Sequence, residues 1–191
     1  MERIGLFGGS FNPVHGGHLL VAQSALEELE LSRLFFIPAA QSPFKPGVQL
    51  APGQERLRLL RLALVGQSRC AIDDQEIERA GISYSIDTVR NYARSFPHAE
   101  LWYLIGGDHA PLLPKWRESS ELAARVQIGI IARPGQSATA LPAPFRGRTL
   151  RGWPFDISAS EIRARVRAGR PIDWLVPSAV AEAIRIYRLY L

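Results

Sequence analysis

The sequence contains almost no cysteine, since Cys70 is the only one among 191 residues. A single cysteine cannot form an internal disulfide, and it excludes zinc sites built from four cysteines or from two cysteines and two histidines. No run of about 18 apolar residues occurs, so we expect no transmembrane helix. The N-terminal segment MERIGLFGG lacks the basic start and the long apolar run of a signal peptide. These absences predict a cytoplasmic protein without a membrane partner.

Two common nucleotide-binding motifs are missing as well. No glycine-rich segment leads into the lysine of a Walker A motif, which excludes a P-loop NTPase. Gly5, Gly8 and Gly9 do not form the G-x-G-x-x-G pattern of dinucleotide-dependent dehydrogenases. Lysine itself is rare, because only Lys45 and Lys115 are lysines among 23 basic residues.

Positive charge is concentrated in one part of the chain. The net charge of +5 arises within residues 146–170, where seven arginines oppose Asp156 and Glu161. The rest of the chain has equal numbers of basic and acidic residues. One local patch predicts a particular anionic ligand, whereas a nucleic-acid-binding protein would have a broad basic surface. We therefore expect no nucleic-acid partner.

Short apolar segments alternate with helical periodicity, which is typical of βαβ units and a parallel sheet. The pattern predicts strands over residues 3–7, 34–37, 70–73, 101–105 and 127–132, and helices over 17–29, 55–65, 83–95, 158–168 and 178–190. Residues 39–53 and 134–148, rich in proline and glycine, are predicted loops. We expect a single α/β domain over residues 1–191, a Rossmann-like open parallel sheet with helices on both faces and C-terminal helices.

The segment GGSFNPVHGGH, residues 8–18, follows the first predicted strand. Its glycines allow the backbone to approach a ligand closely, and a helix beginning near Gly16 presents free N–H groups and a positive dipole to phosphate. His15 and His18 are three residues apart, so their side chains share a face and can donate to phosphate oxygens. A metal-binding pair is less favoured because no third ligand is evident, and a structural role stays open.

A second pattern, ISASEIR, covers residues 157–163. Ser158 and Ser160 stand at the start of a predicted helix, where hydroxyls cap free N–H groups and can bind phosphate. Arg163 lies one turn further and can hold a phosphate through two hydrogen bonds. An ordinary N-cap with solvated arginines explains this segment as well when it is taken alone.

Together, these two segments resemble the two signatures of the H-x-G-H nucleotidyltransferase superfamily, whose members transfer a nucleotidyl group and release pyrophosphate. Further segments resemble bacterial nicotinate-nucleotide adenylyltransferases: SYSIDT at 83–88, IGGD at 105–108 through LPKW at 113–116, and RPG at 133–135. With residues 37–45 and 176–190, the resemblance covers nearly the whole chain.

The resemblance implies a reaction and a set of site residues. ATP and nicotinate mononucleotide would give nicotinate adenine dinucleotide and pyrophosphate, with Mg²⁺ arriving on the ATP phosphates and no metal cage in the protein. Catalysis is assigned to His15, His18, Lys45 and Arg163; ATP binding to Gly8, Gly9, Ser10, Phe11, His18, Gly106, Asp108, Ser158, Ser160 and Arg163; and mononucleotide binding to Lys45, Tyr84, Ser85, Trp116 and Arg133.

In this assignment Trp116 stacks on the pyridine ring, and Tyr84 and Ser85 line the nicotinate pocket. Asp108 follows a predicted strand and two glycines, where a carboxylate can accept hydrogen bonds from ribose hydroxyls. Simpler interpretations stay open, because tryptophans often belong to a core, and Ser85 and Asp108 could be helix caps.

The chain departs from the family pattern at several positions. Many relatives carry histidine where Phe44 precedes Lys45, so one phosphate contact is expected to be missing. Ala159 and Ser160 replace the usual Ser and Thr, and Asn12 stands where Asp is frequent. These departures leave both histidines and Arg163 in place, so activity is expected.

Three alternatives remain. A sister enzyme acting on phosphopantetheine would not need Trp116, and a nucleotide sensor would not need the full phosphate-binding set. A nucleic-acid-binding protein would use the basic segment 146–170. Lys45 and Arg133 could also be solvated surface charges. The helices show no sustained heptad, so the sequence sets no oligomeric state.

Overall fold

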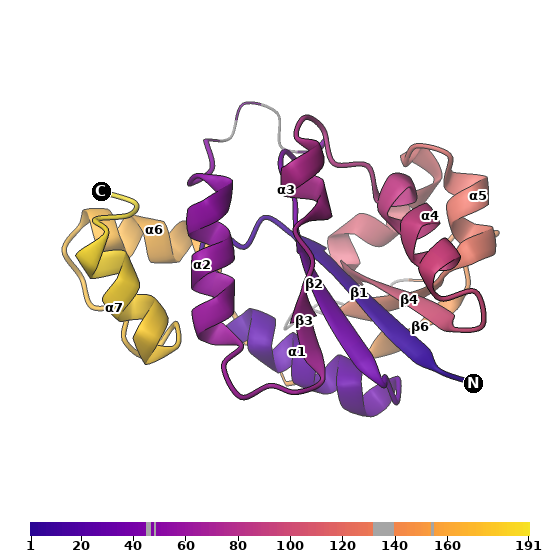
Figure 1. The fold of residues 1–191 in the computed structure, drawn as a ribbon, viewed down its shortest axis with the longest axis horizontal. Helices are drawn as coiled ribbons and strands as arrows, with labels where there is room; N and C mark the ends of the chain where they lie inside the picture. The colour runs from indigo at the N-terminus through magenta and orange to yellow at the C-terminus, as the bar shows by residue number, and fades with distance from the viewer. Residues whose placement is uncertain (45–46, 48, 132–139, 154) are drawn as a thin grey trace.

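The computed structural model describes residues 1–44, 47, 49–131, 140–153 and 155–191. The described residues form one six-stranded parallel sheet (Figure 1). The strands are β1 (Arg3–Gly9), β2 (Arg33–Pro38), β3 (Cys70–Ile72), β4 (Glu100–Gly106), β5 (Gln127–Ile131) and β6 (Gly147–Leu150). The helices are α1 (Gly16–Glu28), α2 (Gly53–Ala63), α3 (Gln75–Arg79), α4 (Ser85–Ser95), the 3₁₀ helix η1 (Gly107–Lys115), α5 (Ser119–Arg125), α6 (Ala159–Arg167) and α7 (Ser178–Ile186). None of these helices is long and apolar enough to cross a membrane.

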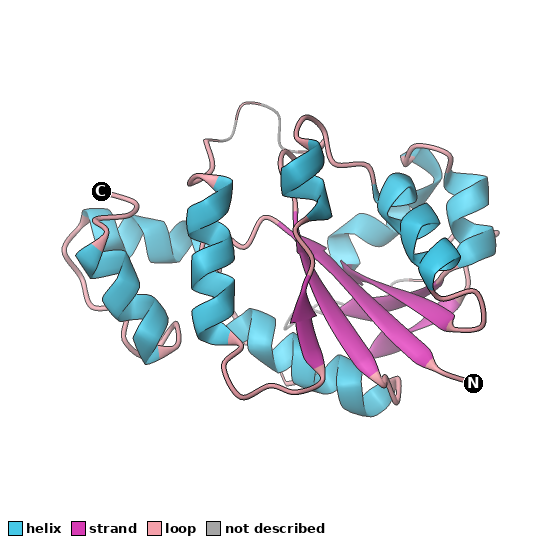
Figure 2. Cartoon of the chain, viewed as in Figure 1, coloured by secondary structure: helices cyan, strands magenta, loops and turns pink. Residues whose placement is uncertain are grey.

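Helices lie on both sides of the sheet (Figure 2), and a layer of buried apolar side chains fills the space on each face. Successive side chains of a strand point to opposite faces, so Leu6 enters one layer and Phe7 the other. The layer around Phe7 includes residues of α1, α2, α6 and α7, and the layer around Leu6 includes residues of α4, α5 and η1. Because both faces are covered, β1 is a nearly continuous apolar segment, as expected for an internal parallel strand.

The strand order β3-β2-β1-β4-β5-β6 places the functional segments on one edge. The chain runs outward from β1 to β3 and then returns to place β4 on the other side of β1. In open α/β sheets, ligands bind outside the carboxyl ends of the strands at this reversal. Here those ends are Gly9 in β1 and Gly106 in β4. The glycine-rich turn and the segment after β4 therefore lie beside each other at the carboxyl edge of the sheet.

The structure confirms the predicted α/β fold and corrects several boundaries. Strand β6 begins inside the predicted loop 134–148. It was not predicted because its sequence, GRTL, is short and has few apolar residues. Helices α3, α5 and η1 were not predicted, because they are short or contain proline. Helix α7 ends at Ile186, before the predicted residue 190, and both Arg188 and Tyr190 adopt positive φ angles. The parts of the 127–132 and 134–148 predictions that fall within 132–139 lie outside the described residues.

Candidate active site

The glycine-rich turn follows β1 directly and is closely packed. A Cβ atom on Gly8 would lie 2.6 Å from the hydroxyl oxygen of Tyr103, so a larger residue would clash there. Phe11 adopts a positive φ of 44°, and its ring is buried among core aromatic residues. The sequence assigned Phe11 to ATP binding. Because Phe11 is only 1% exposed, its ring presents no surface on which a nucleotide could lie.

The two predicted histidines lie side by side at the start of α1. Their ring centroids are 3.8 Å apart, and the backbone N–H of His15 donates to Nδ1 of His18 at 3.2 Å. A neutral His18 that accepts at Nδ1 carries its proton on Nε2, which is therefore a hydrogen-bond donor. His18 is oriented by the same backbone that begins the helix.

His15 is a buried histidine, with only 7% of its surface exposed. Burial lowers its pKa from the ordinary value of 6.5 to about 4. Its Nδ1 atom has no hydrogen-bond partner among the described residues. Near pH 7, His15 is neutral, so any contribution it makes to phosphate binding is a hydrogen bond and not a full positive charge.

The second motif lies at the start of α6 and contacts the first. The hydroxyl of Ser158 caps the helix by accepting from the N–H of Glu161 at 3.1 Å, which confirms an N-cap. Arg163 donates to the carbonyl oxygen of Asn12 at 2.8 Å and to Oγ of Ser160 at 3.1 Å. These hydrogen bonds bring the two predicted phosphate motifs together, although they lie about 150 residues apart in the sequence.

An aromatic pocket of about 260 Å³ lies at the same end of the molecule. It is lined by Pro43, Phe44, Tyr84, Ser85, Ile86, Lys115, Trp116 and Arg117. The predicted residues Tyr84, Ser85 and Trp116 therefore share one pocket. The Phe44 ring lies 5.5 Å from that of Trp116, and the Arg117 guanidinium lies 4.6 Å from the Tyr84 ring. Sequence reasoning assigned no role in this pocket to Phe44 or Arg117.

Tyr103 connects the pocket to the glycine-rich turn. Its hydroxyl lies 2.8 Å from the hydroxyl of Ser85 and also limits the space at Gly8. Burial, together with the nearby Glu76 carboxyl, raises the pKa of Tyr103, so its hydroxyl keeps its proton near neutral pH. Tyr103 was not predicted as a site residue, because it lies inside an apolar strand segment, where an aromatic residue is expected to belong to the core.

The remaining predicted residues fall into two groups. Asp108 is exposed in the first turn of η1, just beyond the end of β4, and a Cβ on Gly106 would lie 2.6 Å from its carboxylate oxygen. Lys45 and Arg133 lie outside the described residues. Within the described ranges, no group of three or more His, Cys, Asp or Glu side chains could hold a metal ion.

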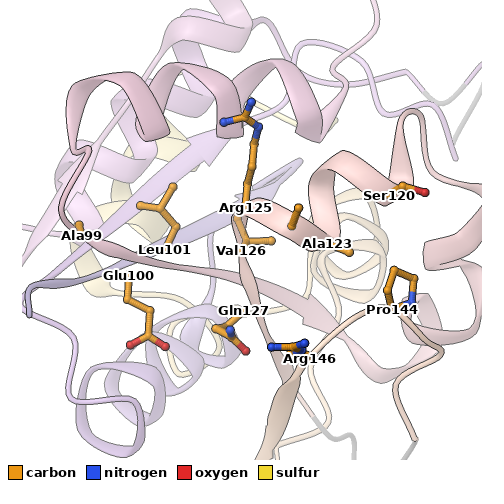
Figure 3. A pocket seen from close by; sticks show the side chains of 11 residues that line it. Ala99, Glu100, Leu101, Ser120, Ala123, Arg125, Val126, Gln127, Pro144 and Arg146 are labelled. Carbon is orange, nitrogen blue, oxygen red and sulfur yellow. The ribbon is translucent and has the colours of Figure 1, made fainter.

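A pocket of about 420 Å³ lies away from these residues (Figure 3). It includes Glu100 and Gln127, which begin β4 and β5, and therefore lies toward the amino ends of these strands. Arg146 lines this pocket, whereas Arg163 contacts the glycine-rich turn. The predicted single basic patch is thus wrong, because the fold separates Arg146 from Arg163.

Comparison with known proteins identifies the family. A family model described as cytidylyltransferase-like matches residues 6–165. A protein of Shouchella clausii named "Probable nicotinate-nucleotide adenylyltransferase" is 41% identical over 194 residues, covering 100% of this chain and 97% of the relative. A protein of Opitutus terrae with the same name is 41% identical over 192 residues, covering 98% of this chain and 97% of the relative.

Solved structures share the fold. The Plasmodium falciparum nicotinic acid mononucleotide adenylyltransferase complexed with NaAD matches with a TM-score of 0.81 at 17% identity, covering 100% of this chain and 98% of that chain. This likeness confirms the fold class. The fold and the matched family model define a cytidylyltransferase-like protein. Within that class, the chain belongs to the nicotinate-nucleotide adenylyltransferase family, as the sequence motifs predicted.

Proposed function

We propose that the protein joins the adenylyl group of ATP to nicotinate mononucleotide, giving nicotinate adenine dinucleotide and pyrophosphate in NAD biosynthesis. The observation that carries this proposal is the hydrogen bond from Arg163 to the carbonyl of Asn12, which unites the two phosphate motifs. The aromatic pocket that contains Trp116 lies near the united motifs, since Tyr103 contacts both regions. A phosphate site beside an aromatic pocket suits two nucleotides that react through their phosphates.

The proposed chemistry is a direct in-line displacement. A 5′-phosphate oxygen of nicotinate mononucleotide forms a bond to the α-phosphorus of ATP, while the bond from that phosphorus to the bridging oxygen breaks. Pyrophosphate leaves with the bonding electrons. The attacking phosphate is already an anion near pH 7, so no general base is required. Catalysis then consists of holding two anions in line and stabilising phosphate charge.

The phosphate groups would be bound by His18, Arg163 and the start of α1. The Nε2–H of His18 donates a hydrogen bond, and Arg163 supplies the full positive charge that the neutral His15 lacks. Mg²⁺ held by the ATP phosphates would neutralise part of their charge. Lys45 and Arg133, which the family resemblance assigns to phosphates, stay part of the proposal.

The pyridine ring would occupy the aromatic pocket and stack on Trp116. Tyr84 and Ser85 line this pocket, and the Ser85 hydroxyl is oriented by the hydroxyl of Tyr103. Hydroxyl and backbone groups here can donate to the nicotinate carboxylate. We further propose that the reaction takes place in the cytoplasm.

Pyrophosphate release tests this function most simply. The protein is supplied with ATP and Mg²⁺, and with nicotinate mononucleotide, nicotinamide mononucleotide or phosphopantetheine in parallel, and the products are identified by mass. We expect strong preference for nicotinate mononucleotide. Equal use of both mononucleotides would contradict carboxylate recognition, turnover with phosphopantetheine alone would contradict the role of Trp116, and ATP binding without turnover would favour a sensor.

A further inference from the structure

Arg56 is a buried cation next to the glycine-rich turn. It lies in the first turns of α2, and only 2% of its surface is exposed. Its Nε donates to the carbonyl of Ala51 at 3.0 Å, and its Nη1 donates to the carbonyls of Ser10 at 2.8 Å and Ala39 at 2.7 Å. One guanidinium thus connects three segments of the site edge: the turn after β1, the end of β2 and the approach to α2.

The described partners of the Arg56 guanidinium are all uncharged backbone carbonyls. In the described part of the chain, no carboxylate forms an ion pair with it, and its hydrogen-bond acceptors are neutral carbonyls. Burial lowers the pKa of Arg56, but a guanidinium stays protonated near pH 7. Buried charges are normally paired, so an uncompensated cation here favours an anion nearby. A nucleotide phosphate at the adjacent turn is such an anion.

The hydrogen bond to Ser10 also sets the direction of the next N–H group. The carbonyl of Ser10 and the N–H of Phe11 belong to one trans peptide, so they point in opposite directions. Because the carbonyl points at Arg56, the Phe11 N–H points away from it. Within the described ranges, this N–H has no acceptor. Phe11 is only 1% exposed, and a buried N–H without an acceptor is costly, so a ligand oxygen placed at this turn would satisfy it.

A second peptide held by Arg56 has both of its polar groups paired. The carbonyl of Ala39 accepts from Arg56, and the N–H of the same peptide, that of Ala40, donates to Oγ of Ser83 at 3.0 Å. Ser83 directly precedes the pocket residues Tyr84 and Ser85. Arg56 thus links, through two peptides, the phosphate turn and the segment that lines the aromatic pocket.

We infer that Arg56 is a positioning residue that aims the Phe11 N–H at a nucleotide phosphate and holds the phosphate turn at a fixed spacing from the aromatic pocket. The identity of the nucleotide rests on the proposed function, but the phosphate contact can be tested without turnover. Inorganic pyrophosphate with Mg²⁺ is the probe, because it has the phosphate chemistry and lacks both nucleosides.

The experiment compares the wild-type protein with Arg56→Met, Arg56→Lys and Arg61→Met. Arg61 is exposed in the last turn of the same helix and serves as the matched control. The chain is labelled with ¹⁵N-phenylalanine, and the assigned Phe11 amide signal is followed during pyrophosphate titration. Adenylyl transfer is measured in parallel, with kcat and KM determined separately for each substrate, below the thermal midpoint of every variant.

We expect the Phe11 amide to shift with pyrophosphate in the wild-type protein and in Arg61→Met. In Arg56→Met the shift should be lost, and kcat/KM for ATP should fall about 10- to 100-fold. Lysine keeps the charge but lacks the planar fork whose Nε and Nη1 reach acceptors in three segments, so Arg56→Lys should recover only part of this loss. If Arg56→Met does not fold, Arg56→Lys provides the comparison, with a weakened shift expected.

An unresponsive Phe11 amide in the wild-type protein would overturn the inference. So would an Arg56 variant with the wild-type shift and kcat/KM, even if its melting temperature falls, because Arg56 would then only stabilise the fold. Failure of the proposed function gives a different result: no turnover with nicotinate mononucleotide, together with an Arg56-dependent Phe11 shift.

Discussion

The two halves of the site differ in what holds their residues in place. On the phosphate side, backbone atoms are the partners: His18 accepts from an N–H, and Arg163 and Arg56 donate to carbonyls. In the aromatic pocket, side chains hold one another, as Phe44 packs on Trp116. Hydrogen bonds to the backbone are directional, whereas the burial of apolar rings is largely non-directional. Changes on the phosphate side should therefore affect turnover, and changes in the pocket should affect the binding of one substrate.

The largest effect is expected for His18→Ala. This change removes the Nε2–H donor that stabilises phosphate charge, and loss of one such donor reduces kcat by about 10²- to 10³-fold. Steady-state kinetics with both substrates, together with thermal unfolding, measures it. Turnover near the wild-type value in a folded variant would contradict the role of His18.

The stability of the folded protein should depend on pH through His15. Folding lowers the pKa of His15 from 6.5 to about 4, because the side chain is buried. The unfolded chain therefore binds the proton more readily, and stability that is complete above pH 6.5 is lost as the pH falls toward 4. The loss from this one group approaches about 3 kcal/mol.

Urea unfolding at pH 7.5 and pH 4.5 measures this loss. In His15→Gln, which has no titrating group at this position, the difference between the two pH values should be smaller by that amount. The same pH dependence in both proteins would show that His15 is not held neutral by burial.

Arg163→Ala should reduce kcat/KM for ATP by about 30-fold, because a charged donor to phosphate is lost. The change also removes the hydrogen bond to the Asn12 carbonyl, so kcat should fall with both substrates saturating. Arg167, exposed at the end of the same helix, is the matched control. Equal effects of Arg163→Ala and Arg167→Ala would mean that α6 contributes only general positive charge.

The smallest effect is expected in the aromatic pocket. Trp116→Ala removes the stacking surface and should raise KM for nicotinate mononucleotide about tenfold, with KM for ATP unchanged. Trp174, which is 96% exposed, provides a control in which the same substitution should have no effect. If Trp116→Ala lowered kcat as much as Arg163→Ala does, the proposed difference between the phosphate side and the aromatic pocket would be contradicted.

The parts of the site that the sequence predicted are those with local spacing. His15 and His18 lie within one helical turn, and Ser158 and Arg163 lie within one motif, so their geometry follows from helix formation. Arg56 was missed because its helix was predicted as a Leu/Arg amphipathic helix, in which arginines are expected to face solvent, whereas Arg56 is buried. Phe44 and Arg117 line the pocket, and Tyr103 packs against Trp116, through tertiary packing that sequence spacing does not reveal.

The prediction missed strand β6 for a similar reason. Strands β1 and β4 are internal, so both faces are apolar and the sequence pattern is strong. Strand β6 is an edge strand with exposed residues at its start, and its pairing with β5 depends on the rest of the sheet. Local composition favoured a loop there, and the tertiary contacts decided otherwise.

The stereochemical course at the α-phosphorus tests the central claim that the site holds two anions in line for one direct displacement. ATP that carries sulfur at a chiral α-phosphorus is converted with nicotinate mononucleotide, and the configuration of the dinucleotide product is determined. A single in-line attack predicts inversion. Retention would indicate two displacements through a covalent enzyme intermediate and would contradict the proposed mechanism.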